Sequence, residues 1–426
     1  MAPGENKGIR MGKTIRDGWN KVLLGDLIEI SHGFPFSGEF FSLEPTHRLI
    51  ITPGNVKRGG GFNDARLKYY KNMEPDPADI PGLTGSRFML EPDDIVIALT
   101  DLSREGNILG VSARLPDVGD RTILQNQRIG KVRVTSKDLS PHFLYWLLRT
   151  HFYRKHVIGA ASGTTVRHTT PGVIRSYRFF LPPIDKQEAI ADFLDILESR
   201  VGLLEQSNEK EERWIVSYCG RKFKRVRRTA PLSDFGRIVC GKTPSKAIRH
   251  YFGGSIPFIK IPDMRNRVYV TDTEDTLTAE GAAVQLSKQV PAHSVCVSCV
   301  ATIGLVTLTA RPSFTNQQIN TIIPRDLRGG YYLYCALKQD KITRTLRKEA
   351  GGGTTIPNLN TRRFSEIAIP YPPRHDLDMF YDVAHGSFER ILLNTRRIEK
   401  LNAYRDSLLP RLMSGSQSPT AREVPT

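Results

Sequence analysis

The chain has 426 residues, of which 61 are Lys or Arg and 44 are Asp or Glu, so its net charge is +17. Its hydrophobic fraction of 39% excludes a wholly disordered chain, and its length predicts two or three domains. Its apolar runs are too short for a membrane span, and 5 Cys are too few for a disulfide framework, so we expect a cytoplasmic protein. The excess positive charge favours a polyanionic partner, above all nucleic acid.

The chain contains an internal repeat. Three short motifs recur 190 positions later: Asn126-Gln127 as Asn316-Gln317, Gly163-Thr164-Thr165 as Gly353-Thr354-Thr355, and Pro182-Pro183 as Pro372-Pro373. Near the start of each copy the spacing is 208, as between Asp26 and Asp234, so the first copy carries a net insertion of 18 residues. We place this insertion in residues 57–82, which are rich in Gly and Pro.

The predicted elements follow the same order in both copies. Short β-like runs come first, such as residues 95–99 and 295–300, and an aromatic helix follows at residues 141–148 and 331–337. A long helix begins after each Pro pair. The predicted organisation is a flexible tail (1–18), a first globular domain (19–182), a first spacer helix with a basic link (183–228), a second globular domain (229–372), a second spacer helix (373–415) and a second flexible tail (416–426).

The two long helices have apolar residues at alternating steps of three and four, which is typical of a coiled-coil seam. The predicted seam consists of Ile190, Leu194, Leu197, Val201, Leu204 and Ile215 in the first helix and Phe380, Ala384, Ile391, Ile398, Leu401 and Leu408 in the second. Asn208 and Asn394 are polar positions that would set the register. We predict that the helices pair antiparallel as a spacer; the alternative is that each packs separately on its own domain.

Motifs for catalysis or metal binding are weak. Residues 236–243 match the P-loop pattern G-x-x-x-x-G-K-[ST], but the interval is strand-like and Pro244 follows the position where a helix must open. Cys296 and Cys299 lack a second ligand pair, and in an extended run they would point to opposite faces. We therefore predict no catalytic residues and no metal site, and keep a nucleotide-binding enzyme using Lys242 and Thr243 as an alternative.

Basic and amide side chains on Gly-interrupted loops are the candidates for contact with DNA, because guanidinium and amide groups can form paired hydrogen bonds with base edges. The predicted DNA-binding residues are Lys57, Arg58, Asn63, Arg66, Lys68, Arg104 and Arg167 in the first copy and Lys246, Arg249, Lys260, Arg265, Asn266 and Arg267 in the second. The basic run at residues 221–228 suits phosphate contacts or a solvated linker face.

Residues shared by the two copies have a different expected role. If the domains read different half-sites, the readers lie where the copies differ. We therefore assign Asn126 and Asn316 to the scaffold or to phosphate positioning in preference to base readout.

This combination resembles the specificity subunits of type I restriction-modification systems, from Trp19 to Gly415. Several local patterns carry the resemblance: Trp19-x4-Leu24-Gly25-Asp26-Leu27, Gly241-Lys242-Thr243-Pro244-Ser245, the Asn-Gln and Gly-Thr-Thr pairs, the helix opening at residues 181–188 and the helix end at residues 407–415. The resemblance implies an α+β fold with two mixed α/β target-recognition domains in a pseudo-two-fold repeat, separated by two long helices that form an antiparallel coiled coil.

The same resemblance implies partners and cofactors. The chain would bind double-stranded DNA, two methyltransferase subunits and a restriction/translocase subunit, in bacteria or archaea. It would hold no cofactor itself, since S-adenosylmethionine and ATP with Mg²⁺ would be bound by the partners. One departure is that the second helix lacks the Gln187-Glu188 start of the first, which puts symmetric docking of two methyltransferases in doubt. An adaptor for acidic proteins is the remaining alternative.

Overall fold

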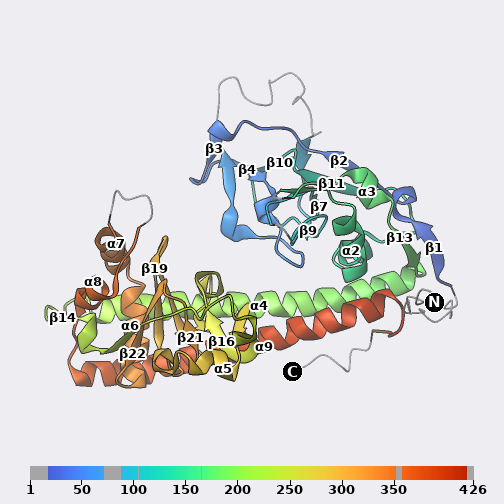
Figure 1. The fold of residues 1–426 in the computed structure, drawn as a ribbon. Coiled ribbons are helices and arrows are strands. Elements are labelled where there is room, and N and C mark those ends of the chain that lie inside the picture. Colours follow the sequence, from blue (N-terminus) through green and yellow to red (C-terminus); the bar gives the residue numbers. More distant parts are fainter. Residues whose placement is uncertain (1–17, 72–87, 104, 165, 352–356, 420–426) are drawn as a thin grey trace, which may run out of the picture. The chain divides into compact units, whose positions relative to one another are not determined.

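Two long helices, α4 (Ile184–Lys222) and α9 (Arg374–Met413), dominate the fold (Figure 1). The computed structural model describes residues 18–71, 88–103, 105–164, 166–351 and 357–419. The chain forms two compact units, unit 1 (Met1–Glu198 with Ala403–Thr426) and unit 2 (Ser199–Asn402). Each long helix contributes residues to both units. These units cut the helices, so they do not test the predicted domain boundaries, which stay a prediction.

Both long helices start where the sequence predicts them. Each follows a Pro pair, whose residues lack the N–H that the helix interior needs and therefore suit its first turn. The helices are 39 and 40 residues long. None of the described helices is both long and apolar enough to cross a membrane.

Within unit 2 the two helices pair antiparallel. The Asn394 Nδ2 atom donates a hydrogen bond of 3.0 Å to Asn208 Oδ1, and Arg390 Nε lies 2.9 Å from Glu211 Oε1. Glu211 follows Asn208 on α4, whereas its partner Arg390 precedes Asn394 on α9. The helices therefore run in opposite directions. This confirms the antiparallel pairing and the polar position in its seam.

The predicted seam residues are mostly buried. Leu204 and Ile398 are half-buried, and the other ten are buried. In unit 2, however, Ile215, Phe380 and Ile391 also belong to the core cluster that contains helix α6 (Leu327–Leu337). The two alternatives of the sequence analysis are therefore combined, because the helices pair with each other and also pack on a domain.

The strands of unit 1 form two main sheets, with orders β2-β11-β7-β9 and β3-β5-β4-β10-β6, and two small ones, β1-β13 and β12-β8. Their bounds are β1 (Asn20–Leu23), β2 (Ile28–His32), β3 (Phe41–Ser42), β4 (Arg48–Ile51), β5 (Lys68–Tyr70), β6 (Met89–Leu90), β7 (Ile95–Ala98), β8 (Thr100–Asp101), β9 (Ser112–Arg114), β10 (Thr122–Gln125), β11 (Ile129–Val134), β12 (Arg167–His168) and β13 (Arg178–Leu181). The helices are α1 (Pro141–Leu147), α2 (His151–Gly159) and α3 (Pro171–Arg175), and the short 3-10 helices are η1 (Leu24–Asp26), η2 (Gly38–Phe40), η3 (Pro53–Asn55) and η4 (Asp64–Arg66).

Unit 2 repeats this plan, with sheets β15-β22-β19-β20-β17, β18-β16-β21 and β14-β23. Its strands are β14 (Thr229–Pro231), β15 (Gly236–Cys240), β16 (Phe252–Ile259), β17 (Tyr269–Val270), β18 (Asp275–Leu277), β19 (Val295–Val300), β20 (Thr302–Thr309), β21 (Phe314–Thr315), β22 (Ile319–Pro324) and β23 (Ala368–Pro370). Its further helices are α5 (Ala279–Ala283), α7 (Asp340–Glu349), α8 (Thr361–Glu366), η7 (Leu232–Asp234), η8 (Arg249–Tyr251), η9 (Ile261–Met264) and η10 (Leu286–Lys288). The parallel pair β4 and β10 recurs as β16 and β21.

The repeat locates the insertion of the first copy. Ile95 pairs with Val132, and the equivalent Val295 pairs with Ile322. The spacing between the copies is 208 at β4 and β16, 200 at Ile95 and Val295, and 190 at Val132 and Ile322. Of the 18 inserted residues, 8 therefore lie before Ile95 and 10 after it. The prediction that all lie in residues 57–82 is wrong, because the connection after β7 is also longer and leaves the sheet pairing intact.

The repeated Asn residues hold a turn in both copies. The Oδ1 atoms of Asn126 and Asn316 each accept a hydrogen bond of 3.1 Å from the backbone N–H two residues later. Gly33 and Gly241 pack against these turns, where a Cβ atom would lie 2.2 Å from a backbone carbonyl oxygen. Only glycine permits so close an approach. The geometry matches the scaffold role that the sequence analysis assigns to the two Asn residues. Of the repeated Gly-Thr-Thr turns, Thr165 and residues 353–355 lie outside the described residues.

The two Cys residues of β19 face different parts of the core. Cys296 belongs to the cluster that contains Ile259, and Cys299 to the cluster that contains α6. Burial raises the pKa of Cys296 to about 12 and that of Cys299 to about 11. Both are therefore protonated core residues, as their spacing predicts, and they do not converge on one metal ion.

The first turn of α4 is fixed by a buried amide. Gln187 is fully buried; its Oε1 atom accepts from the Ser140 N–H at 2.8 Å, and its Nε2 atom donates to the carbonyl oxygens of Asp138 and Pro182. These bonds use both N–H donors of the side-chain amide and one of the two lone pairs of its oxygen. They join the start of α4 to the start of α1.

The first turn of α9 lacks this amide, because Leu377 occupies the position equivalent to Gln187. Ion pairs replace it: Asp378 lies 3.2 Å from Arg328 and 3.3 Å from Arg374, which in turn lies 3.1 Å from Asp326. The helix therefore starts in register without the Gln-Glu sequence. Its attachment is electrostatic and partly exposed, whereas that of α4 is a buried hydrogen-bond network.

Candidate nucleic-acid interface

Each copy has a short 3-10 turn directly after the strand that runs parallel to its neighbour. Before η3, the Thr52 N–H donates a hydrogen bond of 2.9 Å to Asn55 Oδ1. Before η9, the Lys260 N–H donates a hydrogen bond of 2.8 Å to Asp263 Oδ2. Both acceptor residues are buried. The two turns lie 208 positions apart and are equivalent in the repeat.

Four of the predicted DNA-binding residues follow these turns directly. Lys57 and Arg58 follow η3, and Arg265 and Asn266 follow η9 at the same spacing of 208. All four residues are exposed. We call residues 52–63 loop A and residues 260–272 loop B. Each unit therefore presents a pair of adjacent polar or basic side chains from an equivalent, internally bonded turn.

Asn63 has a structural role within loop A. Its Nδ2 atom donates to the Gly54 carbonyl oxygen at 2.9 Å, and its Oδ1 atom accepts from the Ala65 N–H at 3.2 Å. The Asn63 N–H donates to the Asn55 carbonyl oxygen, and the Asn63 carbonyl oxygen accepts from Asn55 Nδ2. The amide therefore closes loop A with one of its N–H donors and one of its acceptor lone pairs, and its contact with DNA stays a prediction.

Arg58 has a basic neighbour that the sequence analysis missed. The half-buried Arg154 guanidinium donates to the Asn107 carbonyl oxygen at 3.1 Å. Burial lowers the pKa of Arg154, and the nearby charge of Arg58 lowers it further. The two guanidinium groups are thus near enough beside loop A for their charges to repel each other. The sequence held no local signal for this, since Arg154 lies in a helix far along the chain.

Two predicted residues of loop B are already paired with carboxylates. Lys260 Nζ lies 2.8 Å from Asp275 Oδ2, and Arg267 Nη1 forms an ion pair with Asp272. A base contact by either residue would require its ion pair to break. Asn266 has a φ of 55°, a left-handed conformation that Asn tolerates better than most residues. Arg265 and Asn266 are therefore the more accessible of the predicted residues on loop B.

The remaining predicted residues are not gathered at these loops. Lys246 and Arg249 precede β16, whereas loop B follows it, so they lie at opposite ends of an eight-residue strand. Lys68, on β5, lies over the Phe41 ring at 5.6 Å, and Arg167 is on β12 beside β8. Arg104 and the side chain of Arg66 lie outside the described part of the chain.

The basic run at residues 221–228 borders a pocket within unit 2 of about 700 Å³. Its walls include Arg325 and Arg374 from other segments, and Asp326, which forms an ion pair with Arg374. The Arg228 guanidinium lies 4.9 Å from the Tyr371 ring centre. The run is therefore one wall of a mixed-charge pocket and also a solvated link, and its phosphate contacts stay a prediction.

The P-loop pattern does not form a phosphate-binding loop. Residues 236–240 are strand β15, and the Lys242 N–H is bonded to the Thr315 carbonyl oxygen at 3.0 Å. The Thr243 hydroxyl donates to Gln317 Oε1 at 2.5 Å. A P-loop requires a helix to open at this Lys-Thr pair, and the chain instead continues as a bonded strand end.

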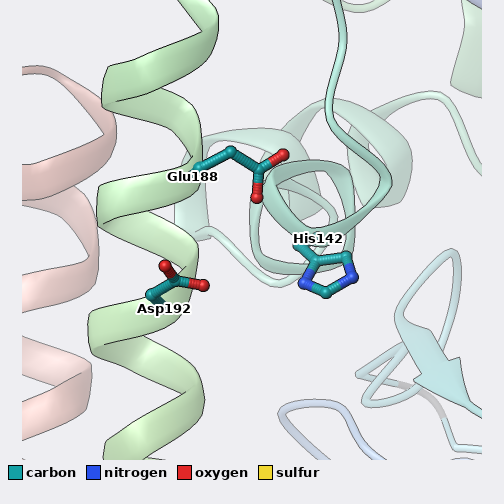
Figure 2. Close-up of side chains that lie close together, drawn as sticks. All are labelled: His142, Glu188 and Asp192. Atoms are coloured by element: carbon teal, nitrogen blue, oxygen red, sulfur yellow. The ribbon is translucent and has the colours of Figure 1, made fainter.

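Figure 2 shows the group of possible metal ligands found among the described residues, His142 from α1 with Glu188 and Asp192 from α4. One ligand atom of each lies within 4.8 Å of the others. His142 and Asp192 are exposed, and His142 Nδ1 is also 3.8 Å from Asp195 Oδ2. Exposed carboxylates and imidazoles commonly form such pairs without a metal ion, so the absence of a metal site stays a prediction.

Comparisons with known proteins agree with this architecture. A family model described as "Type I restriction modification DNA specificity domain" matches residues 115–213 and 228–379. The type I restriction enzyme HindI specificity subunit of Haemophilus influenzae is 49% identical over 184 residues, 43% of this chain and 40% of that protein. The MjaIX specificity subunit of Methanocaldococcus jannaschii is 35% identical over 144 residues, 33% of each protein. These matches span less than half of either relative.

A solved structure shares the fold. The crystal structure of a type I restriction-modification system S subunit from M. genitalium has a TM-score of 0.53 to this chain. It is 14% identical and covers 96% of this chain and 99% of that one. At this identity the likeness concerns the fold alone.

Proposed function

Because this chain belongs to the type I restriction-modification DNA specificity family, we propose that it selects the DNA sequence on which such a complex acts. The observation that supports this most is the duplication of one feature. Loops A and B are equivalent turns that present different exposed side chains, Lys57 and Arg58 in one and Arg265 and Asn266 in the other. Equivalent loops with different readers suit a bipartite site whose halves differ in sequence.

The exposed groups can supply both affinity and selectivity. Lysine and arginine neutralise backbone phosphates, and this term makes binding sensitive to salt. The Arg265 guanidinium can donate two hydrogen bonds to guanine, and the Asn266 amide can pair with adenine in the same way. A base-pair preference of about 1–3 kcal/mol for each such contact is enough to discriminate between sequences.

The proposal includes partners. We infer that the paired helices α4 and α9 are the spacer and the place where two methyltransferase subunits dock, and that a restriction/translocase subunit completes the complex. S-adenosylmethionine and ATP with Mg²⁺ would then be held by those subunits, while this chain contributes binding without catalysis. Its DNA substrate implies a cytoplasmic location in a bacterium or archaeon.

The direct test is selection from random DNA. The full chain with its methyltransferase partner should enrich two short motifs separated by a fixed, unspecified gap. Replacing Lys57 and Arg58 by Ala should weaken one motif, and replacing Arg265 and Asn266 by Ala should weaken the other. A single continuous motif, or equal loss of both motifs in each variant, would count against a bipartite reader.

Two further assays address the alternatives. A nucleotide-binding enzyme would bind ATP in a manner that Lys242→Ala abolishes, and we expect no binding by the isolated chain. An adaptor for acidic proteins would show no steep loss of DNA affinity with salt. We expect a steep loss, because neutralised phosphates release their counterions.

A further inference from the structure

An ion pair lies between loop A and helix α4, with its arginine buried and its glutamate half-buried. The Arg149 side chain is only 3% exposed, and its Nη1 atom is 2.7 Å from Glu198 Oε1. Burying such a pair is costly unless other hydrogen bonds satisfy the remaining donors and acceptors. Tyr145 contributes here, since its hydroxyl donates to Glu198 Oε2 at 2.9 Å and accepts from Arg149 at 2.8 Å. The three side chains form one closed network.

The same guanidinium holds the backbone of loop A. Arg149 Nε donates a hydrogen bond of 3.0 Å to the Gly59 carbonyl oxygen, next to Arg58. Gly60 has a φ of 105°, and a Cβ atom there would lie 2.3 Å from Arg149 Nε. The loop can approach this closely only because residue 60 is glycine. The guanidinium carbon also lies 4.2 Å from the Trp146 ring centre, which fixes its plane.

Glu198 stays ionised in this setting. Burial by itself would raise its pKa, but the charge of Arg149 and the hydrogen bonds from Arg149 and Tyr145 outweigh it, so the pKa is lowered. The ion pair therefore persists at neutral pH. A charged contact thus joins the loop to a helix that continues into unit 2.

Loop B has a comparable attachment made of other residues. The Thr271 hydroxyl, at the end of loop B, donates a hydrogen bond to Glu399 of α9. Arg267 and Asp272 influence the same carboxyl group. In each unit, a loop that carries exposed basic or amide side chains is therefore bonded, directly or through Arg149, to a glutamate of a long helix.

We propose that Arg149 and Glu198 are positioning residues for sequence recognition, which place the backbone of loop A so that Lys57 and Arg58 reach defined base pairs. This inference rests on the proposed DNA-reading function. Neither residue needs to touch DNA, because the loop backbone transmits their effect. In this they differ from Lys57 and Arg58, which would contact the DNA directly.

The chain offers a matched control. Arg114 of β9 pairs with Asp195 of α4 at 3.3 Å and lies over the Tyr145 ring at 4.5 Å, much as Arg149 does at 5.0 Å. Among the described contacts, Arg114 makes no bond to loop A. Arg114→Met thus removes a similar domain-to-helix contact and leaves the loop attachment in place.

The test compares Arg149→Met and Arg114→Met in the full chain with its methyltransferase partner. Selection from random DNA should show that Arg149→Met loses about tenfold discrimination in the motif assigned to loop A, the size expected for one misplaced base contact. The other motif should be unchanged, and Arg114→Met should keep both. Arg149→Lys, which keeps the charge but loses the fork, should be intermediate and covers the case in which Arg149→Met fails to fold.

A second readout needs no DNA. The Gly60 N–H is bonded to the Lys57 carbonyl oxygen and the Gly61 N–H to that of Ser112, both at 3.0 Å. Hydrogen exchange at these amides should accelerate in Arg149→Met and not in Arg114→Met. Unchanged exchange with both motifs retained would overturn the proposal. If the unmodified chain enriches no bipartite site but exchange still accelerates, the DNA-reading function fails while the loop attachment stands.

Discussion

The two glutamates that attach the loops respond to pH in opposite directions. The pKa of Glu198 is lowered, so its contribution to stability is present above the unfolded pKa and is lost as pH falls through the folded value. The pKa of Glu399 is raised by burial and then by Asp272, against the opposing effects of Thr271 and Arg267. Its contribution is present below the unfolded pKa and is lost as pH rises through the folded value.

Glu399→Gln should therefore remove the loss of folding stability that ionisation of Glu399 causes at higher pH. Because Gln resembles the protonated acid, we expect the variant to match the parent chain at about pH 4 and to be more stable than it near pH 7. Glu198→Gln should behave inversely, with a deficit near neutral pH that shrinks in acid. Thermal unfolding midpoints across this range measure both; parallel pH profiles in the two variants would contradict the assigned shifts.

At the scale of elements, the long helices owe their pairing to more than an apolar seam. Asn394 is 8% exposed and bonded to Asn208, and the Asn208 amide also reaches Thr395 Oγ1 at 3.5 Å. A paired amide inside a helix seam contributes little net stability but disfavours other registers. Leaving one amide without its partner is the costly case.

Asn394→Leu should accordingly lower the free energy of unfolding by about 1–3 kcal/mol, because the half-buried Asn208 loses its partner. The double variant Asn208→Leu with Asn394→Leu should recover most of that loss, as two apolar residues can pack together. Urea unfolding of the full chain gives these values, with Gln206→Leu on the exposed face of α4 as the control. Additive losses in the double variant would show that the two amides do not act as a pair.

For the whole molecule, the junctions between the compact units fall inside the two helices, between Glu198 and Ser199 and between Asn402 and Ala403. The units are thus connected twice by helix. The length of these helices can therefore be changed at the junctions without altering loop A or loop B.

Inserting seven residues at both junctions should lengthen the connection by about 10 Å, since a helix rises about 1.5 Å per residue. At about 3.4 Å per base pair, we expect the gap in the enriched DNA site to grow by about three base pairs while both motifs stay the same. Inserting the heptad in only one helix should disrupt the pairing of α4 with α9 and weaken selection of the bipartite DNA site. An unchanged gap in the double insertion would mean that the helices do not set the spacing.

Local and periodic features of this protein were predictable from sequence. The repeat, the two long helices with their polar seam positions and the opposite faces of Cys296 and Cys299 all follow from spacing, and the antiparallel direction follows from the order of the domains along the chain. Such patterns depend only on residues that are a few positions apart or that recur at a fixed interval, so they can be read without the tertiary structure. Strand β15, which ends one residue before Gly241, was predictable for the same reason, although a nucleotide-binding pattern overlaps it.

Only the tertiary structure decided which side chains share a site. It placed Lys57 and Arg58 at the position equivalent to Arg265 and Asn266, assigned Asn63 to the loop scaffold, and divided the insertion between two connections. It also joined Arg149 to Gly59, 90 positions away. Such contacts depend on how strands and helices pack, and a guanidinium in the sequence carries no sign of whether it will face solvent, a carboxylate or the backbone of a distant loop.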